Sequence, residues 1–191
     1  MSKERTTAFT DAILAIIMTI LVLELQEPKT LDWAGLWAMR ESYMAYAISF
    51  FWLGTMWIGL HNEWENVKKI SGSTLWANLV LLFWASLFPY TTKIVSAHFD
   101  NKMAQVMYGT IAVLTTISNI WLSHTLSTIK ENAGMKADSE FRQRWLSIDV
   151  VIKFLGIIVA ATIYPPAGML GVLFAALVIA IPAHFLENKK K

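Results

Sequence analysis

The chain has 191 residues, of which 55% are hydrophobic and none is cysteine, and its formal net charge is +2. The lack of cysteine excludes disulfide staples, thiolate metal sites and cysteine nucleophiles, and the small net charge gives no reason to expect a nucleic-acid partner. The composition is too apolar for an ordinary soluble domain and too interrupted by charge for a single membrane span.

Hydropathy predicts a bundle of membrane helices. Six helices of about twenty residues each match the hydrocarbon thickness of a bilayer, roughly 30 Å, and use most of the chain. The expected fold class is therefore all-α, an integral membrane protein with six transmembrane helices per subunit in a single domain of residues 1–191. The predicted helices lie at about 6–25, 43–62, 74–97, 103–125, 145–164 and 166–186.

The first predicted helix contains an acid. The apolar run from Ala12 to Leu23 is too short to span a membrane by itself, so the helix must begin near Thr6 and include Asp11. A carboxylate at mid-membrane costs about 2.5–3.5 kcal/mol on insertion scales, and less near an interface. Asp11 should therefore have polar partners on neighbouring helices.

One face of this first helix carries a stripe at the spacing i, i+3, i+4 and i+7, and Asp11 lies roughly opposite. If the stripe faces lipid, nothing further follows from it. If it faces a symmetry axis, the helix lines a central pore in which apolar rings gate by dewetting and a hydroxyl ring replaces part of an ion's hydration shell. The residues concerned are Ile16, Ile20 and Leu23, which would form the pore constriction, Thr19, which would form the ring of hydroxyls, and Glu24 at the outer mouth, where it would concentrate cations.

The connections between the other segments are short and predict the topology. The longest runs from Lys130 to Arg144, is heavily charged, and is expected to be a solvated helical connection on the cytoplasmic side. With six spans, eleven of the sixteen basic residues fall on the side of the two termini, four fall on the other side, and Lys153 lies inside the fifth span. The positive-inside rule then predicts that both termini are cytoplasmic.

The opening of the chain carries a recognisable motif. Arg5-x-x-x-Phe9-Thr10-Asp11, followed by an apolar run, resembles the signature first helix of the transmembrane protein 175 family, Arg-x-x-x-Phe-Ser-Asp, with threonine in place of the usual serine. The resemblance continues in the second predicted helix, with Trp57-Ile58-Gly59-Leu60-His61-Asn62, and in the third, from Asn78 to Tyr90. By motif it covers about half of the chain.

This resemblance implies a potassium-permeable channel, found in the plasma membrane of bacteria, that is a homo-oligomer, a tetramer in bacterial members. It implies that the first helices line the pore and that no Thr-Val-Gly-Tyr-Gly filter exists; the sequence contains no such segment. By position, Ile16 matches the family's hydrophobic constriction, Thr19 its threonine layer and Leu23 a further apolar ring. The motif's polar residues should form a structural network behind the pore, with members Arg5, Phe9, Thr10, Asp11, Trp57, His61 and Asn78.

A second function class stays open beside the channel, a small secondary or proton-coupled transporter whose relay would be Asp11, His61, Asp149 and Lys153. Asp149 and Lys153 are four residues apart on one predicted helix, so they are expected to pair. That pair could be structural or could mark a proton-coupled site.

Sites of other kinds are not expected. His61 and Glu65 are also four residues apart, but two ligands are fewer than a zinc site needs, so no metal or cofactor is expected. No nucleophile motif is present, and the protein is not expected to be an enzyme. The expected partners are further copies of the chain, membrane lipid and permeant monovalent cations, with potassium as the permeant ion.

Overall fold

The computed structural model describes residues 2–187, with side chains as far as Ile179, and all regular secondary structure in that range is helical. The all-α class predicted from hydropathy is confirmed. In chain order the elements are α1 (Lys3–Leu23), α2 (Trp33–Ala38), α3 (Arg40–Glu65), α4 (Gly72–Ser86), α5 (Phe88–Ala97), α6 (Lys102–Ser127), the 3-10 helix η1 (Lys130–Met135), α7 (Lys136–Thr162) and α8 (Ala167–Glu187).

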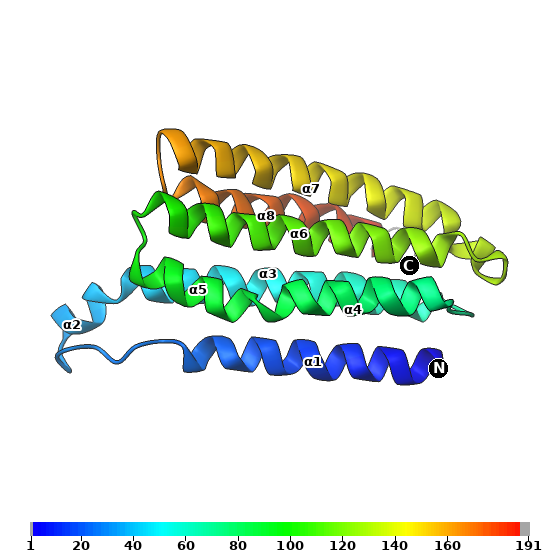
Figure 1. The fold of residues 1–191 in the computed structure, drawn as a ribbon, viewed down its shortest axis with the longest axis horizontal. Coiled ribbons are helices and arrows are strands. Elements are labelled where there is room, and N and C mark those ends of the chain that lie inside the picture. Colours follow the sequence, from blue (N-terminus) through cyan, green and yellow to red (C-terminus); the bar gives the residue numbers. More distant parts are fainter. Residues whose placement is uncertain (1, 188–191) are drawn as a thin grey trace.

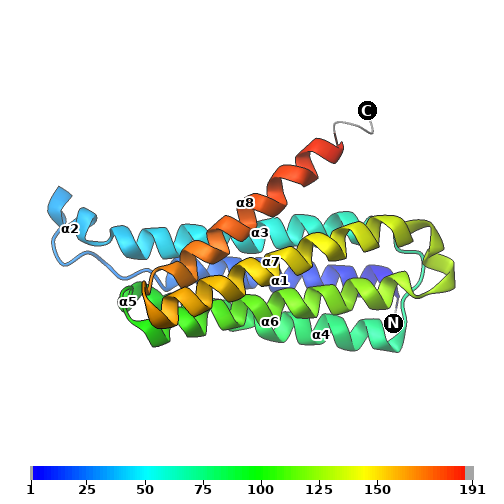
Figure 2. The same cartoon turned by 90° about the horizontal axis from the view of Figure 1, so that it is seen from above.

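The long helices lie roughly parallel in a bundle (Figure 1). α1 forms one edge and packs against α3, α4 and α5, while α6 packs against α4, α7 and α8. α8 crosses the bundle obliquely, and its C-terminal half diverges from the other helices (Figure 2). The close α7–α8 crossing requires glycine, since a Cβ at Gly156 would lie 2.9 Å from the carbonyl oxygen of Ala167.

Five segments of the described chain are long and apolar enough to cross a membrane, and the protein is an integral membrane protein. These are Lys3–Leu23, Arg40–Glu65, Gly72–Ala97, Lys102–Ser127 and Lys130–Thr162. The apolar part of α8 within the described side chains, Ala167–Ile179, is shorter than a span. The structure therefore shows five candidate spans, where the sequence predicts six.

The predicted helix at 74–97 is divided into α4 and α5. The break lies at Leu87, directly before the Phe88-Pro89 step that begins α5. Proline has no N–H and its ring displaces the carbonyl four residues earlier, so the regular hydrogen-bond ladder ends there. Upstream, α4 begins with a capping box in which Ser71 accepts from the backbone of Thr74 and the Thr74 side chain accepts from the backbone of Ser71.

Two connections between the long helices contain helical turns. The charged connection 130–144 is helical, as predicted, and most of its side chains are exposed, but it is not wholly solvated, because Arg142 forms an ion pair with Glu63 of α3. The loop after α1 contains the short helix α2, which is not predicted from the sequence and which begins where Asp32 Oδ1 accepts a hydrogen bond from the Gly35 N–H at 2.7 Å.

Candidate ion-conduction site

One face of α1 is fixed to the rest of the subunit. Its buried side chains recur every three or four residues, as expected for a helix that packs through one side, and they are Thr6, Thr10, Leu14, Ile17 and Leu21. These residues face the bundle formed by α3, α4 and α5. The rotation of α1 about its own axis is therefore set within a single subunit.

The opposite face of α1 carries the predicted pore-lining stripe and is not covered by any of the described residues. Ile16 is 57% exposed and Leu23 79% exposed, and Thr19 and Ile20 between them are also exposed. The Thr19 hydroxyl donates to the carbonyl oxygen of Ile16 at 2.8 Å, which satisfies its proton and leaves its oxygen lone pairs facing outward. The stripe is free to face a symmetry axis, another copy of the chain or lipid.

A buried amide–hydroxyl contact joins α1 to α4. Asn78 Nδ2 donates to Thr10 Oγ1 at 2.9 Å. The Thr10 hydroxyl has one proton, which it donates either to the Thr6 carbonyl oxygen at 2.9 Å or to Asn78 Oδ1 at 3.1 Å. Because both side chains are buried, losing either one would leave the other without its partner.

The acid of the first helix bonds to α3. Trp57 Nε1 donates to Asp11 Oδ1 at 2.9 Å, so the carboxylate has a hydrogen-bond donor on the neighbouring helix. The Trp57 ring is tilted against the His61 ring, with 5.6 Å between centroids, and His61 Nε2 lies 3.5 Å from Glu65 Oε1. Asp11 is thus directed toward α3, away from the exposed stripe.

Two members of the predicted network lie apart from these contacts. Arg5 and Phe9 are exposed, and within the described residues the Arg5 side chain forms no hydrogen bond or ion pair. Within the described residues of one chain, then, the remaining predicted residues form two separate groups and not one continuous network. The first is Thr10 with Asn78, and the second is Asp11 with Trp57 and His61. A role for Arg5 and Phe9 stays a prediction.

At the C-terminal end of α1, the negative charge of Glu24 is balanced by a lysine of α5. Glu24 Oε2 lies 2.6 Å from Lys93 Nζ of α5. Both side chains are partly exposed, so the pair is screened by solvent, but Lys93 still reduces the negative potential that Glu24 would present at a mouth. Nothing local in the sequence indicates this partner, since the two residues lie on different predicted helices.

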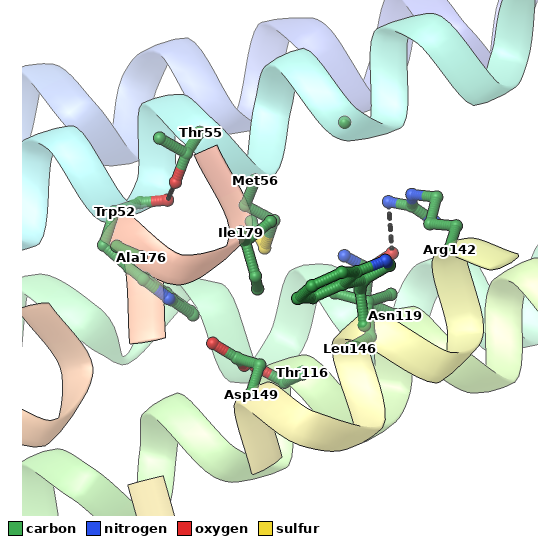
Figure 3. Close-up of a pocket in the computed structure, with 12 residues that line it drawn as sticks. Trp52, Thr55, Met56, Thr116, Asn119, Arg142, Leu146, Asp149, Ala176 and Ile179 are labelled. Carbon is green, nitrogen blue, oxygen red and sulfur yellow. Dashed lines mark hydrogen bonds between the residues drawn. The ribbon is translucent and has the colours of Figure 1, made fainter. Parts of the chain in front are cut away.

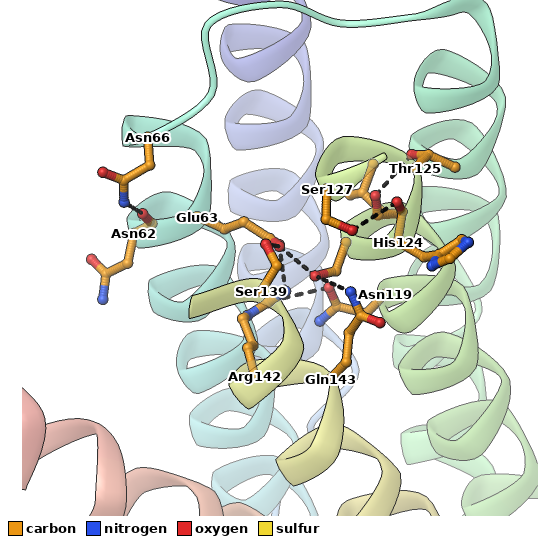
Figure 4. Close-up of polar contacts among 12 residues, drawn as sticks. Asn62, Glu63, Asn66, Asn119, His124, Thr125, Ser127, Ser139, Arg142 and Gln143 are labelled. Carbon is orange, nitrogen blue, oxygen red and sulfur yellow. Dashed lines mark hydrogen bonds and ion pairs between the residues drawn. The ribbon is translucent and has the colours of Figure 1, made fainter. Parts of the chain in front are cut away.

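A cluster of charged and polar side chains joins α3, α6 and α7 (Figure 4). Glu63 of α3 accepts from Ser123 of α6 and from Arg142 of α7, and Arg142 Nη2 also donates to Asn119 Oδ1 at 3.2 Å. Sequence reasoning missed this cluster. The available signal was periodicity, because Glu63 continues the buried stripe of Met56 and Leu60 on α3.

The second buried charge pair was predicted, and it is confirmed. Lys153 donates to Asp149 Oδ2 on α7, and both side chains are fully buried. Neither His61 nor Asp11 is bonded to this pair. Among the described residues, no three His, Asp or Glu side chains gather in a way that could hold a metal ion.

Comparisons with known proteins agree with this arrangement. The sequence model of the family described as "Endosomal/lysosomal potassium channel TMEM175" matches residues 5–89, from the first-helix motif into α5. A protein of Chryseobacterium sp. (strain P1-3), named a potassium channel, is 36% identical over 197 residues, which covers 100% of this chain and 99% of that protein. The endosomal/lysosomal proton channel TMEM175 of Mus musculus is 28% identical over 109 residues, 51% of this chain and 22% of that protein.

The fold itself has a solved counterpart. The crystal structure of a lysosomal potassium-selective channel TMEM175 homolog from Chamaesiphon minutus superposes with a TM-score of 0.70, covering 95% of this chain and 97% of that one at 22% identity. Because the Chryseobacterium relative matches over its whole length, the resemblance no longer depends on the first-helix motif alone. The chain belongs to the TMEM175 family, a family of channels and not of enzymes.

Proposed function

We propose that the protein is a potassium-selective cation channel in which several copies of α1 surround one axis. The observation that carries this proposal is the two-sided character of α1. Its inner face is held by packing and by the Thr10–Asn78 and Asp11–Trp57 hydrogen bonds, while its outer face, including Ile16 and Leu23, is exposed. In an oligomer that outer face becomes the pore wall.

The stripe supplies both elements that such a pore needs. Rings of Ile16, Ile20 and Leu23 form a hydrophobic constriction that closes by dewetting. A ring of Thr19 hydroxyls between them offers oxygen atoms to a partly dehydrated cation, in place of the carbonyl filter that the sequence lacks. The relatives named as potassium channels support potassium as the permeant ion.

The proposed assembly is a homotetramer in the bacterial plasma membrane with both termini in the cytoplasm. One amphipathic helix per chain cannot enclose a pore, so the proposal requires further copies of the chain. The distribution of basic residues supports the orientation, because the start of α1, the α3–α4 connection and the start of α7 lie at the same end of the bundle (Figure 1). These segments carry Lys3, Lys69 and Arg142.

A proton-coupled transporter is the weaker proposal. Its relay would need Asp11, His61, Asp149 and Lys153 to communicate. Asp11 is bonded to Trp57, His61 is paired with Glu65, and the Asp149–Lys153 pair lies between α6, α7 and α3. No hydrogen bond or ion pair in the described part of the chain joins Asp11 to His61, or either of them to the Asp149–Lys153 pair, which favours the channel.

The channel proposal is tested by potassium flux into liposomes. Ile16→Ala should raise the flux several-fold, because it widens and wets the constriction. The matched control is Ile158→Ala, an equally conservative change at an exposed isoleucine of α7, which should leave the flux unchanged. Absence of flux from folded wild-type protein, or the same response to both substitutions, would remove the basis for a pore along α1.

A further inference from the structure

A cavity that is partly open at the subunit surface is lined by helices other than α1 (Figure 3). Its volume is about 70 Å³, and it lies between α3, α6, α7 and α8. One water molecule in the liquid occupies about 30 Å³, so this space admits more than one. The lining residues that matter below are Met56, Thr116, Asn119, Arg142, Asp149 and Ala176.

Asp149 and Lys153 form a buried ion pair at the cavity wall, and the Lys153 ammonium group has all the acceptors it needs. Lys153 Nζ donates to Asp149 Oδ2 and to Thr116 Oγ1, the latter at 2.8 Å. It also lies 4.5 Å from the centroid of the Trp52 ring, in the position of a cation–π contact. All three ammonium protons of Lys153 therefore have an acceptor.

The Asp149 carboxylate, by contrast, lacks a hydrogen-bond donor at one of its two oxygens. Asp149 Oδ2 accepts from Lys153 and, at 2.9 Å, from Thr116, whereas the buried Oδ1 accepts from no group in the described residues. Figure 3 shows the Asp149 side chain projecting from α7 into the space between α3 and α8. A buried carboxylate oxygen without a donor is strongly unfavourable, so the cavity should supply a donor.

The charges around the cavity favour a neutral occupant. Asp149 is balanced by Lys153, and at the opposite end Arg142 is balanced by Glu63. Since the surroundings carry no net charge, neither a cation nor an anion is attracted. An acyl chain from the bilayer is neutral but has no proton to donate to Asp149 Oδ1.

We propose that this cavity is a water-binding site in each subunit, separate from the pore, in which ordered water donates to Asp149 Oδ1. Polar groups continue from the acid toward the cytoplasmic end, because Asn119 and Arg142 line the same cavity and are bonded to each other at 3.2 Å. Water thus connects the two buried ion pairs, Asp149–Lys153 and Glu63–Arg142.

Two native methionines make the proposal testable without any substitution. Met56 lines the cavity and is 8% exposed, while Met169 on α8 is 0% exposed and does not line it. Hydroxyl radicals generated by X-ray irradiation convert methionine to its sulfoxide only where water is near the sulfur. In the full-length protein in lipid nanodiscs, we expect Met56 to be oxidised on the order of tenfold faster than Met169.

A cavity-filling variant gives a second test of the water-binding site. Ala176→Leu places a larger apolar side chain in the cavity and should lower the oxidation rate of Met56 toward that of Met169, with potassium flux retained because α1 is untouched. Equal slow oxidation of both methionines in the native protein would show a dry or lipid-filled cavity and would overturn the proposal. So would an unchanged Met56 rate in folded Ala176→Leu protein, because the radicals would then come from bulk solvent.

Discussion

The edge and the centre of the bundle differ in how much of each helix the subunit itself buries. Only 28% of the most apolar stretch of α1 is buried, against 56% for α6. α1 is held by two hydrogen-bonded contacts, Thr10–Asn78 and Asp11–Trp57, whereas the helices around α6 enclose two charged pairs. The buried charges and the burial of α6 place the scaffold at the centre of the bundle, whereas α1 leaves a large surface exposed, which the proposed channel uses for contacts with other copies of the chain. α7 also lies at the surface, since only 22% of its most apolar stretch is buried.

The largest expected effect comes from breaking the scaffold at its buried charges. Asp149→Leu leaves Lys153 without its counter-ion and should destabilise the subunit by about 3–5 kcal/mol. The double variant Asp149→Leu/Lys153→Met removes both charges and should recover most of that loss. The midpoint of unfolding in a denaturing detergent measures both. A double variant as unstable as the single one would mean that the charges themselves, and not their pairing, stabilise the scaffold.

A smaller effect is expected at the contact that orients α1. Thr10→Val leaves the buried amide of Asn78 without its partner and should cost about 1–3 kcal/mol. Thr10→Ser keeps the hydroxyl and is the matched control, which should stay close to wild type. The same unfolding assay compares them, and potassium flux should fall with Thr10→Val because α1 can then rotate. Equal stability of the two variants would show that the hydroxyl does not hold the helix.

A substitution in the exposed stripe of α1 should change the ion selectivity of the proposed channel and should hardly change the stability of the subunit. Thr19 is exposed within the subunit, so Thr19→Val removes an oxygen from the proposed pore without disturbing the core. The ratio of potassium to sodium permeability should fall by several-fold, since no other hydroxyl ring lies on this face. Bi-ionic reversal potentials measure the ratio, with Thr110→Val on α6, another exposed threonine, as the control. An unchanged ratio would remove Thr19 from the selectivity site.

The smallest effect concerns α2, outside both regions. The pKa of Asp32 is lowered below its usual value of 3.8, because its carboxylate accepts from the Gly35 N–H and then from the Thr30 hydroxyl. The folded form therefore favours the ionised acid, and the stabilisation of α2 is present above pH 3.8 and is lost as the pH falls through the lowered value. Asp32→Ala should speed amide hydrogen exchange across α2 at neutral pH, and Asp32→Asn, another good capping residue, should do so less.

The local features of the candidate site could be predicted from the sequence. The exposed stripe of Ile16, Thr19 and Leu23 follows from helical spacing, and its exposure within the subunit is what the structure shows. The i, i+4 pair of Asp149 and Lys153 follows from the same spacing and is present. Both depend only on residues within two turns of one helix, where geometry is set by the helix itself.

The contacts between helices could not be predicted in this way. Glu63 and Arg142 are 79 residues apart, and the second lies in a charged stretch that hydropathy assigns to solvent. Glu24 and Lys93 belong to helices whose relative rotation no local pattern specifies. A motif resemblance suggested Thr10, Asp11, Trp57 and Asn78 together, but only the packing of α1 against α3 and α4 shows which of them bond to each other.

The sequence by itself determined that the fold is a bundle of apolar helices, that Ile16, Thr19 and Leu23 lie on one face of α1, and that Asp149 has a lysine one turn away. These are consequences of hydropathy and of 3.6 residues per turn, and both act over short stretches of chain. The tertiary structure alone decided that Glu63 and Arg142 join α3 to α7, that Lys93 offsets Glu24, and that a cavity faces the free oxygen of Asp149. Those features depend on how helices distant in sequence are rotated and packed, and their side chains must satisfy one another once water is excluded.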